Sequence, residues 1–361
     1  MNKTRTTISI MLMWLIVATV QSIYEAALLS SYEVSAERIN FWVLLSTSLI
    51  AALIAGFFMG YFFFPKANIW LRTMSYGKTL WLIFLTFSGF YLVLGTAGSF
   101  MYNGLTYGFG SPESWKYAVE HLTSTENLKN YMFWLTVTML TTLLLQINDK
   151  YGPGNFQAFL LGKYFKPTRV DRIFMFLDLR SSTTIAEKLG ELEYFTFIRR
   201  FFQDVTPPLL ENQGEIYQYV GDEIVVSWKL NQGLTQQRCL RSFFDAKAKI
   251  ESLADMYQKA FGVVPSFKVG LHYGSVIVGE IGLVKRDIAF SGDVLNTTAR
   301  IQSKCNHFGV DILISDQLFK ALQQEGQNQF QYNSVGEVEL RGKAKPLQLY
   351  TVENNVETPG V

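Results

Sequence analysis

The sequence is poor in the residues that build disulfide frameworks and zinc sites. It contains two cysteines, Cys239 and Cys305, and neither belongs to a C-x-x-C pair. Its three histidines, His121, His272 and His307, are scattered along the chain. A disulfide scaffold and a zinc site are therefore not expected, and two isolated cysteines are typical of a reducing cytosolic compartment.

Charge is also scarce in this chain. Charged residues make up 17% of its 361 residues, hydrophobic residues make up 49%, and the formal net charge is +2. So small an excess of positive charge gives no indication of a nucleic-acid partner. A charged fraction this low indicates either a very apolar core or segments that are buried in lipid. The length allows two or three domains.

The N-terminal part of the chain holds four long uncharged runs, at residues 6–24, 39–64, 79–102 and 131–147. Each run approaches the roughly 20 residues that a helix needs to cross the hydrocarbon core of a bilayer. Such segments must be helical in lipid, because their backbone polar groups need internal partners. We therefore predict an all-α bundle of four transmembrane helices over residues 1–148. The first run is expected to remain uncleaved, since no small-residue cleavage site follows it.

The connecting segments predict how these helices are oriented. Basic residues lie before the first run, between the second and third runs, and after the fourth run: Lys3, Arg5, Lys66, Arg72, Lys78, Lys150, Lys163, Lys166, Arg169 and Arg172. The two remaining loops are richer in glutamate than in basic residues. Because basic loops stay on the cytoplasmic side, we expect a multi-pass protein of the inner membrane with both termini in the cytoplasm.

The composition changes after Asp149, where the segment 151–154 (YGPG) interrupts any helix. We predict a juxtamembrane linker at 149–171, a soluble α/β (α+β) domain at 172–355 and a tail at 356–361. Within the domain, short apolar runs predict strands at 173–177, 215–219, 224–228, 267–272, 275–278, 288–290, 311–314, 330–338 and 347–352. Longer stretches predict helices at 183–203, 234–261 and 293–306.

Two acidic residues stand at the ends of predicted strands. Asp178 ends an apolar strand, and Asp222 lies in the tight turn between two others. Carboxylates at the tips of neighbouring strands could hold a pair of divalent cations, which suits phosphoryl and nucleotidyl transfer. Oxygen ligands favour Mg²⁺ or Mn²⁺. Read alone, however, the Gly-Asp dipeptide at Asp222 is more typical of an ordinary turn.

Two further segments carry polar residues that could bind a phosphorylated ligand. Ser182 and Thr183 lie at a strand-to-helix junction, where backbone N–H groups can bind phosphate, although plain helix capping is the more common role of such residues when they are read alone. Asn296 and Arg300 are four residues apart on one predicted helix and so share a face. The arginine could neutralise charge on a reacting phosphorus atom, and the asparagine could orient a ribose. A solvated polar face is the alternative.

Taken together, these segments resemble the class III adenylate/guanylate cyclase family. The resemblance covers residues 172–352 and rests on matched motifs in the same order: 176–179 (FLDL), 219–223 (YVGDE), 270–282 (GLHYGSVIVGEIG), 291–300 (SGDVLNTTAR) and 340–343 (LRGK). Any one of these motifs alone would be weak. The resemblance implies a ferredoxin-like α/β domain that works as a head-to-tail homodimer, with its active sites at the dimer interface.

The resemblance also implies a role for each candidate residue. Asp178, Asp222 and the carbonyl of Leu179 would bind two Mg²⁺ or Mn²⁺ ions. Asn296 and Arg300 would come from the partner subunit, to position the ribose and stabilise the transition state. Lys343 would contact a phosphate. The enzyme would be a phosphorus–oxygen lyase in which the ribose 3′-hydroxyl attacks the α-phosphorus, giving a 3′,5′-cyclic nucleotide and pyrophosphate.

The chain departs from the family pattern at the positions that select the purine. Gln218 stands four residues before Asp222, where a lysine is usual in adenylate cyclases, and Ala289 stands seven before Asn296. Neither residue matches guanylate cyclases. Ser181-Ser182 also replaces the usual Gly-Phe pair. ATP is the expected substrate on the family's general preference, and cyclic AMP signalling is the expected role.

Three alternatives stay open. A guanylate cyclase would use GTP, and the amide of Gln218 can donate and accept hydrogen bonds and so read either purine. A catalytically silent receptor would bind nucleotide without turning it over. A diguanylate cyclase shares the metal chemistry, but the 221–223 (GDE) string is only part of that family's signature, and the Asn296–Arg300 helix argues against it.

Overall fold

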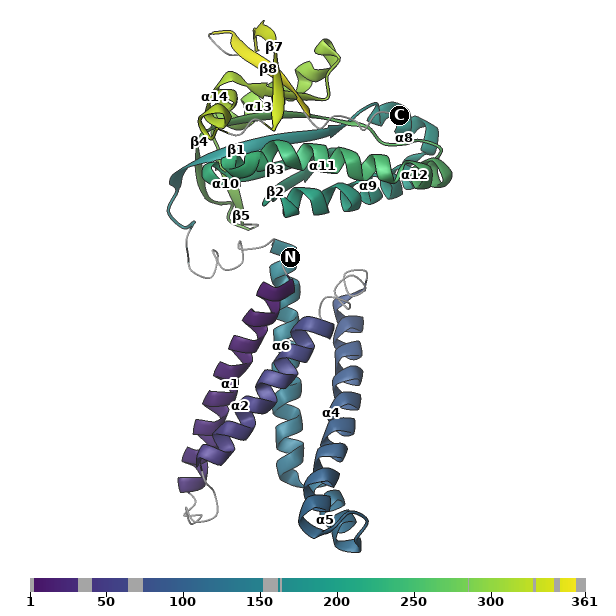
Figure 1. Cartoon of the computed structure of the whole chain (residues 1–361), viewed down its shortest axis with the longest axis vertical. Coiled ribbons are helices and arrows are strands. Elements are labelled where there is room, and N and C mark those ends of the chain that lie inside the picture. Colours follow the sequence, from purple (N-terminus) through teal and green to yellow (C-terminus); the bar gives the residue numbers. More distant parts are fainter. Residues whose placement is uncertain are drawn as a thin grey trace. The chain divides into compact units, whose positions relative to one another are not determined.

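The computed structural model of the chain describes residues 3–31, 41–63, 74–151, 162, 164–284, 286–326, 329–340 and 345–354. The chain divides into two compact units at residues 1–151 and 152–361. We call them the N-terminal unit and the C-terminal unit and describe each by itself (Figure 1).

All regular elements in the described residues of the N-terminal unit are helical. Its elements are α1 (Lys3–Ser31), α2 (Phe41–Phe58), the π-helical turn η2 (Met59–Phe63), α4 (Tyr76–Tyr107), α5 (Pro112–Leu122) and α6 (Thr125–Tyr151). The short helix α5 falls in the loop that follows the third apolar run. Large apolar side chains of α4 are exposed on the surface of the unit, as expected for a helix that faces lipid.

Glycines allow two of these helices to approach closely. A Cβ atom on Gly60 would lie 2.8 Å from the Cα of Thr7, and one on Gly56 would lie 3.3 Å from the Cα of Met11. Small residues of this kind are enriched where membrane helices pack. The indole of Trp14 then joins α1 to α6 by donating a hydrogen bond to Thr141 Oγ1 at 3.0 Å.

Three helices of the N-terminal unit are long and apolar enough to cross a membrane: Thr6–Leu28, Tyr76–Ala97 and Asn127–Ile147. They coincide with the first, third and fourth predicted runs. The second predicted run, 39–64, extends beyond the described residues at both ends, and its apolar helix Ser48–Phe62 is shorter. The described residues therefore give three candidate spans where the sequence predicted four.

The C-terminal unit is built on one mixed, eight-stranded sheet. The strands are β1 (Thr168–Leu179), β2 (Glu215–Val220), β3 (Glu223–Lys229), β4 (Phe267–Ile281), β5 (Asp287–Ser291), β6 (Ile312–Ser315), β7 (Phe330–Val338) and β8 (Leu347–Asn354). Their order is β2-β3-β1-β4-β6-β8-β7, and β5 pairs with β4. Only the β4–β6 pairing is parallel among the described pairs. Because β3 and β4 flank β1, the C-terminal end of β1 lies between these two strands.

Helices cover both faces of this sheet, which explains why β1 reads as an unbroken apolar run. Ile173, Met175 and Leu177 pack into the core that includes residues of α9 (Glu191–Glu211) and α11 (Arg238–Ser252). Phe174 and Phe176 point to the opposite face, beside Val294 of α13 (Asp293–Phe308). Figure 1 shows α13 on the other side of the sheet from α9 and α11.

The remaining helices of the C-terminal unit are α8 (Ser182–Leu189), α10 (Leu230–Leu234), the 3-10 turn η3 (Thr235–Gln237), α12 (Ala254–Phe261) and α14 (Asp316–Gln324). The helix predicted at 183–203 is therefore two helices, which are separated at Gly190 with φ 77°. The helix predicted at 234–261 is likewise interrupted, at Leu253 between α11 and α12.

One strand prediction was wrong for an instructive reason. The sequence suggested two strands, 267–272 and 275–278, with Gly274 as the break, whereas β4 runs without interruption from Phe267 to Ile281. A Cβ atom at Gly274 would lie 2.7 Å from Cγ2 of Val294. The glycine therefore makes room for α13 against the sheet, and it does not mark a turn.

Candidate active site

The first predicted metal ligand, Asp178, lies at the end of the central strand. It is the next-to-last residue of β1, and the buried Leu179 is the last. Its backbone pairs with Glu223 of β3 on one side and with Lys268 of β4 on the other. The carboxylate is therefore partly shielded and has charged residues on both neighbouring strands.

The second predicted ligand, Asp222, lies in the turn between β2 and β3. Gly221 precedes it with φ 62°, a left-handed conformation that glycine adopts without steric cost. Asp222 stands immediately before Glu223, the residue that pairs with Asp178. The turn therefore brings Asp222 to the same edge of the sheet as Asp178, as the sequence motif predicted.

The electrostatics of Glu223 show that three carboxylates gather here. Burial raises its pKa to about 7, the negative charges of Asp178 and Asp222 add to the rise, and Lys268 acts against it. A cluster with three acids and one adjacent lysine carries an excess of negative charge. An excess of negative charge attracts cations, and carboxylate oxygens are donors that divalent cations prefer.

The structure adds two side chains to the site that the sequence analysis missed. Lys268 is buried, and its Nζ lies 3.2 Å from Asp178 Oδ2. Gln302 of α13 donates a hydrogen bond from Nε2 to the same oxygen at 2.8 Å. One signal was available for each: a lysine inside an apolar strand, and a glutamine on the face of a helix that otherwise buries Thr298, Ile301 and Cys305.

The strand-to-helix junction after Leu179 has an unusual backbone. Ser181 has φ 54° and ψ 30° and precedes α8 without capping it through its side chain. Ser182 is half-buried and Thr183 is exposed, at the first two positions of α8. The first turn of α8 follows this junction, and backbone N–H groups at such a helix start can bind an anion, so phosphate binding by Ser182 and Thr183 stays a prediction.

Tyr194 of α9 lies beside this junction. Burial, together with the charges of Asp222 and Asp178, raises the pKa of Tyr194, while a hydrogen bond with the side chain of Ser182 works in the opposite direction. The tyrosine hydroxyl therefore lies within electrostatic range of both predicted metal ligands. The position of Ser182 is thus linked to the acidic cluster.

Arg180 anchors the junction to the far end of α13. Its guanidinium donates to Asn306 Oδ1 at 2.8 Å, to the Val310 carbonyl at 2.6 Å and to Asp311 Oδ1 at 2.9 Å. Lys247 contacts the other carboxylate oxygen of Asp311 at 2.9 Å. The arginine that follows the metal-binding motif is therefore committed to a structural network.

Asn296 and Arg300 lie on α13 as the sequence predicted. Asn296 is exposed and Arg300 is half-buried. Within the part of the chain that the structure describes, hydrogen bonds and ion pairs link Asp178 to Gln302 and Lys268, and none links it to Asn296 or Arg300. A single chain therefore does not bring the two halves of the predicted site into contact through these bonds.

The two positions that are predicted to select the purine lie on strands joined by a side-chain contact. Tyr217 occupies a bulge in β2, and its hydroxyl accepts a hydrogen bond from the backbone N–H of Phe290 at 3.3 Å. Gln218 is the exposed residue after this tyrosine, and Ala289 is the half-buried residue before this phenylalanine. This hydrogen bond therefore links the residues that flank Gln218 and Ala289 in the sequence. Lys343 lies outside the described residues.

The described side chains do not form a ready-made metal cage. Across those residues, no group of three or more His, Cys, Asp and Glu side chains is arranged to hold an ion. The predicted ligand set, two carboxylates and one backbone carbonyl, is smaller than such a group. An open set of this kind leaves positions for substrate oxygens and water, which is usual for Mg²⁺.

Sequence comparison relates this site to known proteins. The family described as the adenylate and guanylate cyclase catalytic domain matches residues 166–354, slightly more than half of the chain. Adenylate cyclase 2 of Rhizobium meliloti is 32% identical over 209 residues, which are 58% of this chain and 57% of the relative. An adenylate cyclase of Anabaena cylindrica is 24% identical over 188 residues, or 50% of this chain and 36% of the relative. The chain thus spans little more than half of these relatives at most.

Structural comparison gives the same fold. A bacterial light-regulated adenylyl cyclase superposes with a TM-score of 0.53 at 22% identity, over 64% of this chain and 67% of that chain. At this identity the likeness concerns the fold alone. The order of the strands around Asp178 and Asp222 is therefore one that known proteins share.

Proposed function

Because the chain belongs to the adenylate and guanylate cyclase family, we propose that it is a membrane-anchored cyclase that converts ATP to 3′,5′-cyclic AMP and pyrophosphate. In this reaction the ribose 3′-oxygen forms a bond to the α-phosphorus, and the bond from that phosphorus to the departing pyrophosphate breaks. The observation that carries the proposal is the gathering of Asp178, Asp222 and Glu223, which is reflected in the raised pKa of Glu223.

We infer that Asp178, Asp222 and the Leu179 carbonyl hold two Mg²⁺ or Mn²⁺ ions. The donor set fits such ions, because it consists of oxygen atoms and carries more negative charge than Lys268 balances. When bound, divalent ions of this kind lower the pKa of an attacking hydroxyl and stabilise the charge of the leaving phosphate.

The protein's own side chains divide the remaining tasks. Ser182 and Thr183 bind phosphate oxygens at the first turn of α8. Asn296 and Arg300 of a second copy complete the site, the first by orienting the ribose and the second by neutralising charge on the α-phosphoryl group. Lys343 contacts the phosphates. These roles follow from the family resemblance, and the exposure of Asn296 supports its availability to a partner.

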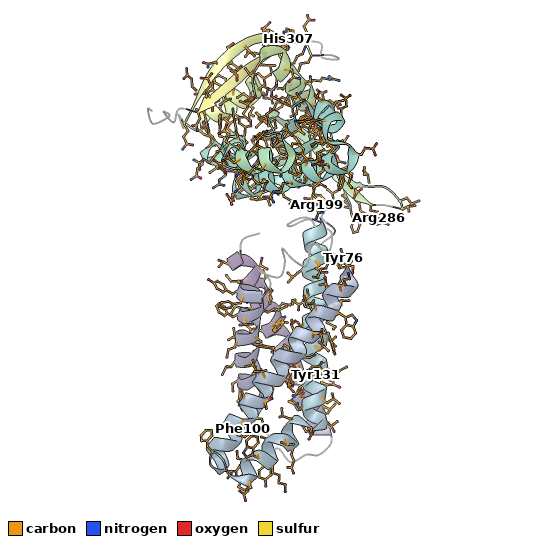
Figure 2. The ribbon with its side chains drawn as sticks, turned by 90° about the vertical axis from the view of Figure 1, so that its right-hand side faces the viewer. Tyr76, Phe100, Tyr131, Arg199, Arg286 and His307 are labelled. Carbon is orange, nitrogen blue, oxygen red and sulfur yellow. The ribbon has the colours of Figure 1, made fainter. Side chains whose placement is uncertain are left out.

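Two features of the fold support a head-to-tail homodimer of the C-terminal unit. The order of β1 to β4 with α9 and α11 follows the β-α-β-β-α-β pattern of ferredoxin-like domains. In addition, the hairpin of β4 and β5 ends in apolar residues that are almost completely exposed, Leu283 at 88% and Val284 at 100%. Figure 2 shows Arg286 at the projecting end of this hairpin. Exposed apolar tips of this kind indicate a surface that a partner covers.

The N-terminal unit is proposed as the membrane anchor and input domain. Three described helices can span a bilayer, and the apolar run at 39–64 is proposed as a fourth span. The distribution of lysine and arginine supports an inner-membrane protein with both termini in the cytoplasm. In this arrangement residues 1–148 form the membrane domain, 149–171 the linker and 172–355 the catalytic domain.

The glutamine at position 218 also favours two other functions. An exposed Gln218 can pair with guanine as well as adenine, which favours a guanylate cyclase. The missing purine-selecting lysine also favours a silent receptor that binds nucleotide without cyclising it. ATP remains the proposed substrate because the two similar curated proteins are adenylate cyclases.

The test is to incubate the full chain in lipid nanodiscs with Mn²⁺ and either ATP or GTP, and to measure cyclic nucleotide and pyrophosphate. The rate per chain should be higher in nanodiscs that hold two chains than in nanodiscs that hold one, because the active site needs two chains. Asp222→Ala serves as the control and should abolish product formation. Nucleotide binding by the unaltered chain without pyrophosphate release would instead establish the silent receptor.

A further inference from the structure

Gln302 is a buried polar side chain with one specific task in the structure. It is 5% exposed, and its Nε2 donates a hydrogen bond to Asp178 Oδ2 at 2.8 Å. A buried amide that donates to a carboxylate stabilises the charged form of that carboxylate and fixes its orientation. Gln302 therefore acts on a proposed metal ligand from the neighbouring helix α13.

The bond leaves the two oxygens of Asp178 in different situations. Oδ2 is contacted both by Gln302 and by Lys268 Nζ, at 2.8 Å and 3.2 Å. In the part of the chain that the structure describes, both of these contacts use Oδ2, so a divalent ion would be held through Oδ1. The orientation of the carboxylate is thus set by two donors from outside β1.

The amide of Gln302 is itself held in place. A Cβ atom at Gly270 would lie 2.4 Å from the backbone nitrogen of Gln302, so α13 rests directly on the backbone of β4. Further along the helix, Cys305 Sγ donates to the Val269 carbonyl at 3.3 Å. The helix is therefore packed closely against β4 at this point, which holds Gln302 beside the end of β1.

The same helix carries the residues proposed to serve the other active site. Asn296 and Arg300 lie on α13, and Asn296 is exposed where Gln302 is buried. One face of the helix thus binds the metal ligand of its own chain. The other face supplies the ribose and transition-state contacts to the partner chain.

We propose that Gln302 is a positioning residue that couples the two active sites of the dimer. This inference rests on the proposed function, in which Asn296 and Arg300 act in trans. A divalent ion held at Asp178 would act on the same carboxylate that Gln302 holds, and the hydrogen bond would pass this change to α13 and so to the partner's site. By thermodynamic reciprocity, engagement of α13 by the partner's nucleotide changes metal affinity at Asp178 by the same factor.

The first experiment measures this coupling without turnover. The full chain in nanodiscs is titrated with Mn²⁺ in the absence of nucleotide, free Mn²⁺ is followed by electron paramagnetic resonance, and amide hydrogen exchange is measured in α13. In the unaltered chain, saturation with Mn²⁺ should change exchange in α13. In Gln302→Met, Mn²⁺ should bind about tenfold more weakly, and saturation should leave exchange in α13 unchanged.

A matched control and a second variant guard against trivial explanations. Gln323→Met makes the same substitution at an exposed glutamine of α14 and should behave like the unaltered chain. Gln302→Asn keeps an amide but shortens it by one methylene, so it tests the same hydrogen bond should the methionine variant not fold. An unchanged Mn²⁺ response of α13 in both position-302 variants would overturn the coupling.

The second experiment separates the two directions in mixed dimers. Chains with Asp222→Ala and chains with Arg300→Ala are combined, so that each mixed dimer has a single intact site. Gln302→Met is then added to one chain or to the other. In the Arg300→Ala chain it lies beside Asp178 of the intact site, and we expect about tenfold more Mn²⁺ to be needed for half-maximal rate.

In the Asp222→Ala chain, Gln302→Met lies on the helix that supplies Arg300 to the intact site. For this second combination, coupling predicts a lower kcat at saturating Mn²⁺, because Gln302 then acts on the intact site only through α13. An effect confined to the first combination would mean that Gln302 serves only its own metal ligand, and the coupling would be rejected. If the parent pair gives no activity at all, the proposed dimeric function fails, while the exchange experiment still decides whether Gln302 links Asp178 to α13.

Discussion

Glu223 lies directly across the β1–β3 ladder from Asp178, and the negative charge of Asp178 contributes to a pKa of about 7 for Glu223. The acidic cluster therefore contains one group that titrates near neutral pH in addition to the two proposed metal ligands. This pairing has a direct consequence for stability, because the same glutamate has its ordinary pKa of 4.5 in an unfolded chain.

Glu223→Gln should remove a pH dependence of stability. Between pH 4.5 and about 7 the folded chain keeps a proton on Glu223 that the unfolded chain has released. The unfolding free energy contributed by this group therefore falls as pH rises through that window. Because Glu223 is only half-buried, we expect a change of about 1–2 kcal/mol. Hydrogen exchange of the C-terminal unit with chelator present, at about pH 5 and about pH 7.5, measures it. A slope retained in Glu223→Gln would show that other groups cause it.

Lys268→Met should make the C-terminal unit depend on divalent ions for its stability. Lys268 is the cation that contacts Asp178 and opposes the rise in the pKa of Glu223. Without it, the carboxylates repel one another unless a metal ion neutralises them. We expect chelation to lower the unfolding free energy of Lys268→Met by about 2 kcal/mol more than it lowers that of the unaltered chain. Lys268→Arg retains the charge and is the matched control. Equal effects of chelator in all three chains would contradict this role.

Ser181→Gly should stabilise the junction between β1 and α8. Ser181 has φ 54°, which is unfavourable for a residue with a Cβ atom. Glycine relieves this strain but has more entropy to lose on folding, so the net gain is about 1 kcal/mol or less. Ser182→Gly, one residue later inside the helix, should instead destabilise by a similar amount. Thermal unfolding of both variants gives the comparison, and a lower midpoint for Ser181→Gly would refute it.

Gln218→Lys should shift nucleotide preference toward ATP. Gln218 is exposed on β2, next to Tyr217, which contacts Phe290 of β5. A lysine at this position donates hydrogen bonds but accepts none, so it no longer suits both purines. We expect the ratio of kcat/KM for ATP over GTP to rise by about tenfold. Gln331→Lys, at an exposed position of β7, adds the same charge elsewhere on the sheet. An unchanged ratio in Gln218→Lys would mean that position 218 does not read the base.

The parts of the site that the sequence predicted are those with a local signature. Asp178 follows an apolar strand, Asp222 lies in a Gly-Asp turn, and Asn296 and Arg300 share one helical face. Each pattern is contained within a few consecutive residues. The family motif then supplied their order along the chain, and the fold places the two acids at one edge of the sheet.

The parts that the sequence did not predict depend on packing between distant segments. Gln302 reaches Asp178 across a separation of 124 residues, and no local pattern specifies that contact. Gly274 has the same appearance in a sequence whether it ends a strand or admits a helix, and only the position of Val294 decides between them. Lys268 was overlooked because its partner is on the neighbouring strand.

Gly270→Ala tests the close packing on which the arrangement of the site depends. An added Cβ would lie 2.4 Å from the backbone nitrogen of Gln302 and 2.6 Å from its Cα, so backbone atoms would have to move. We expect a loss of at least about 3 kcal/mol in unfolding free energy, together with a loss of cyclase activity as α13 is displaced. Gly274→Ala is the matched control on the same strand. Its Cβ would approach only a methyl group of Val294, at 2.7 Å, so a change of side-chain rotamer can relieve most of the clash at a cost nearer 1 kcal/mol. Equal destabilisation by the two substitutions, measured by hydrogen exchange of α13, would show that the helix does not depend on direct contact with the backbone at Gly270.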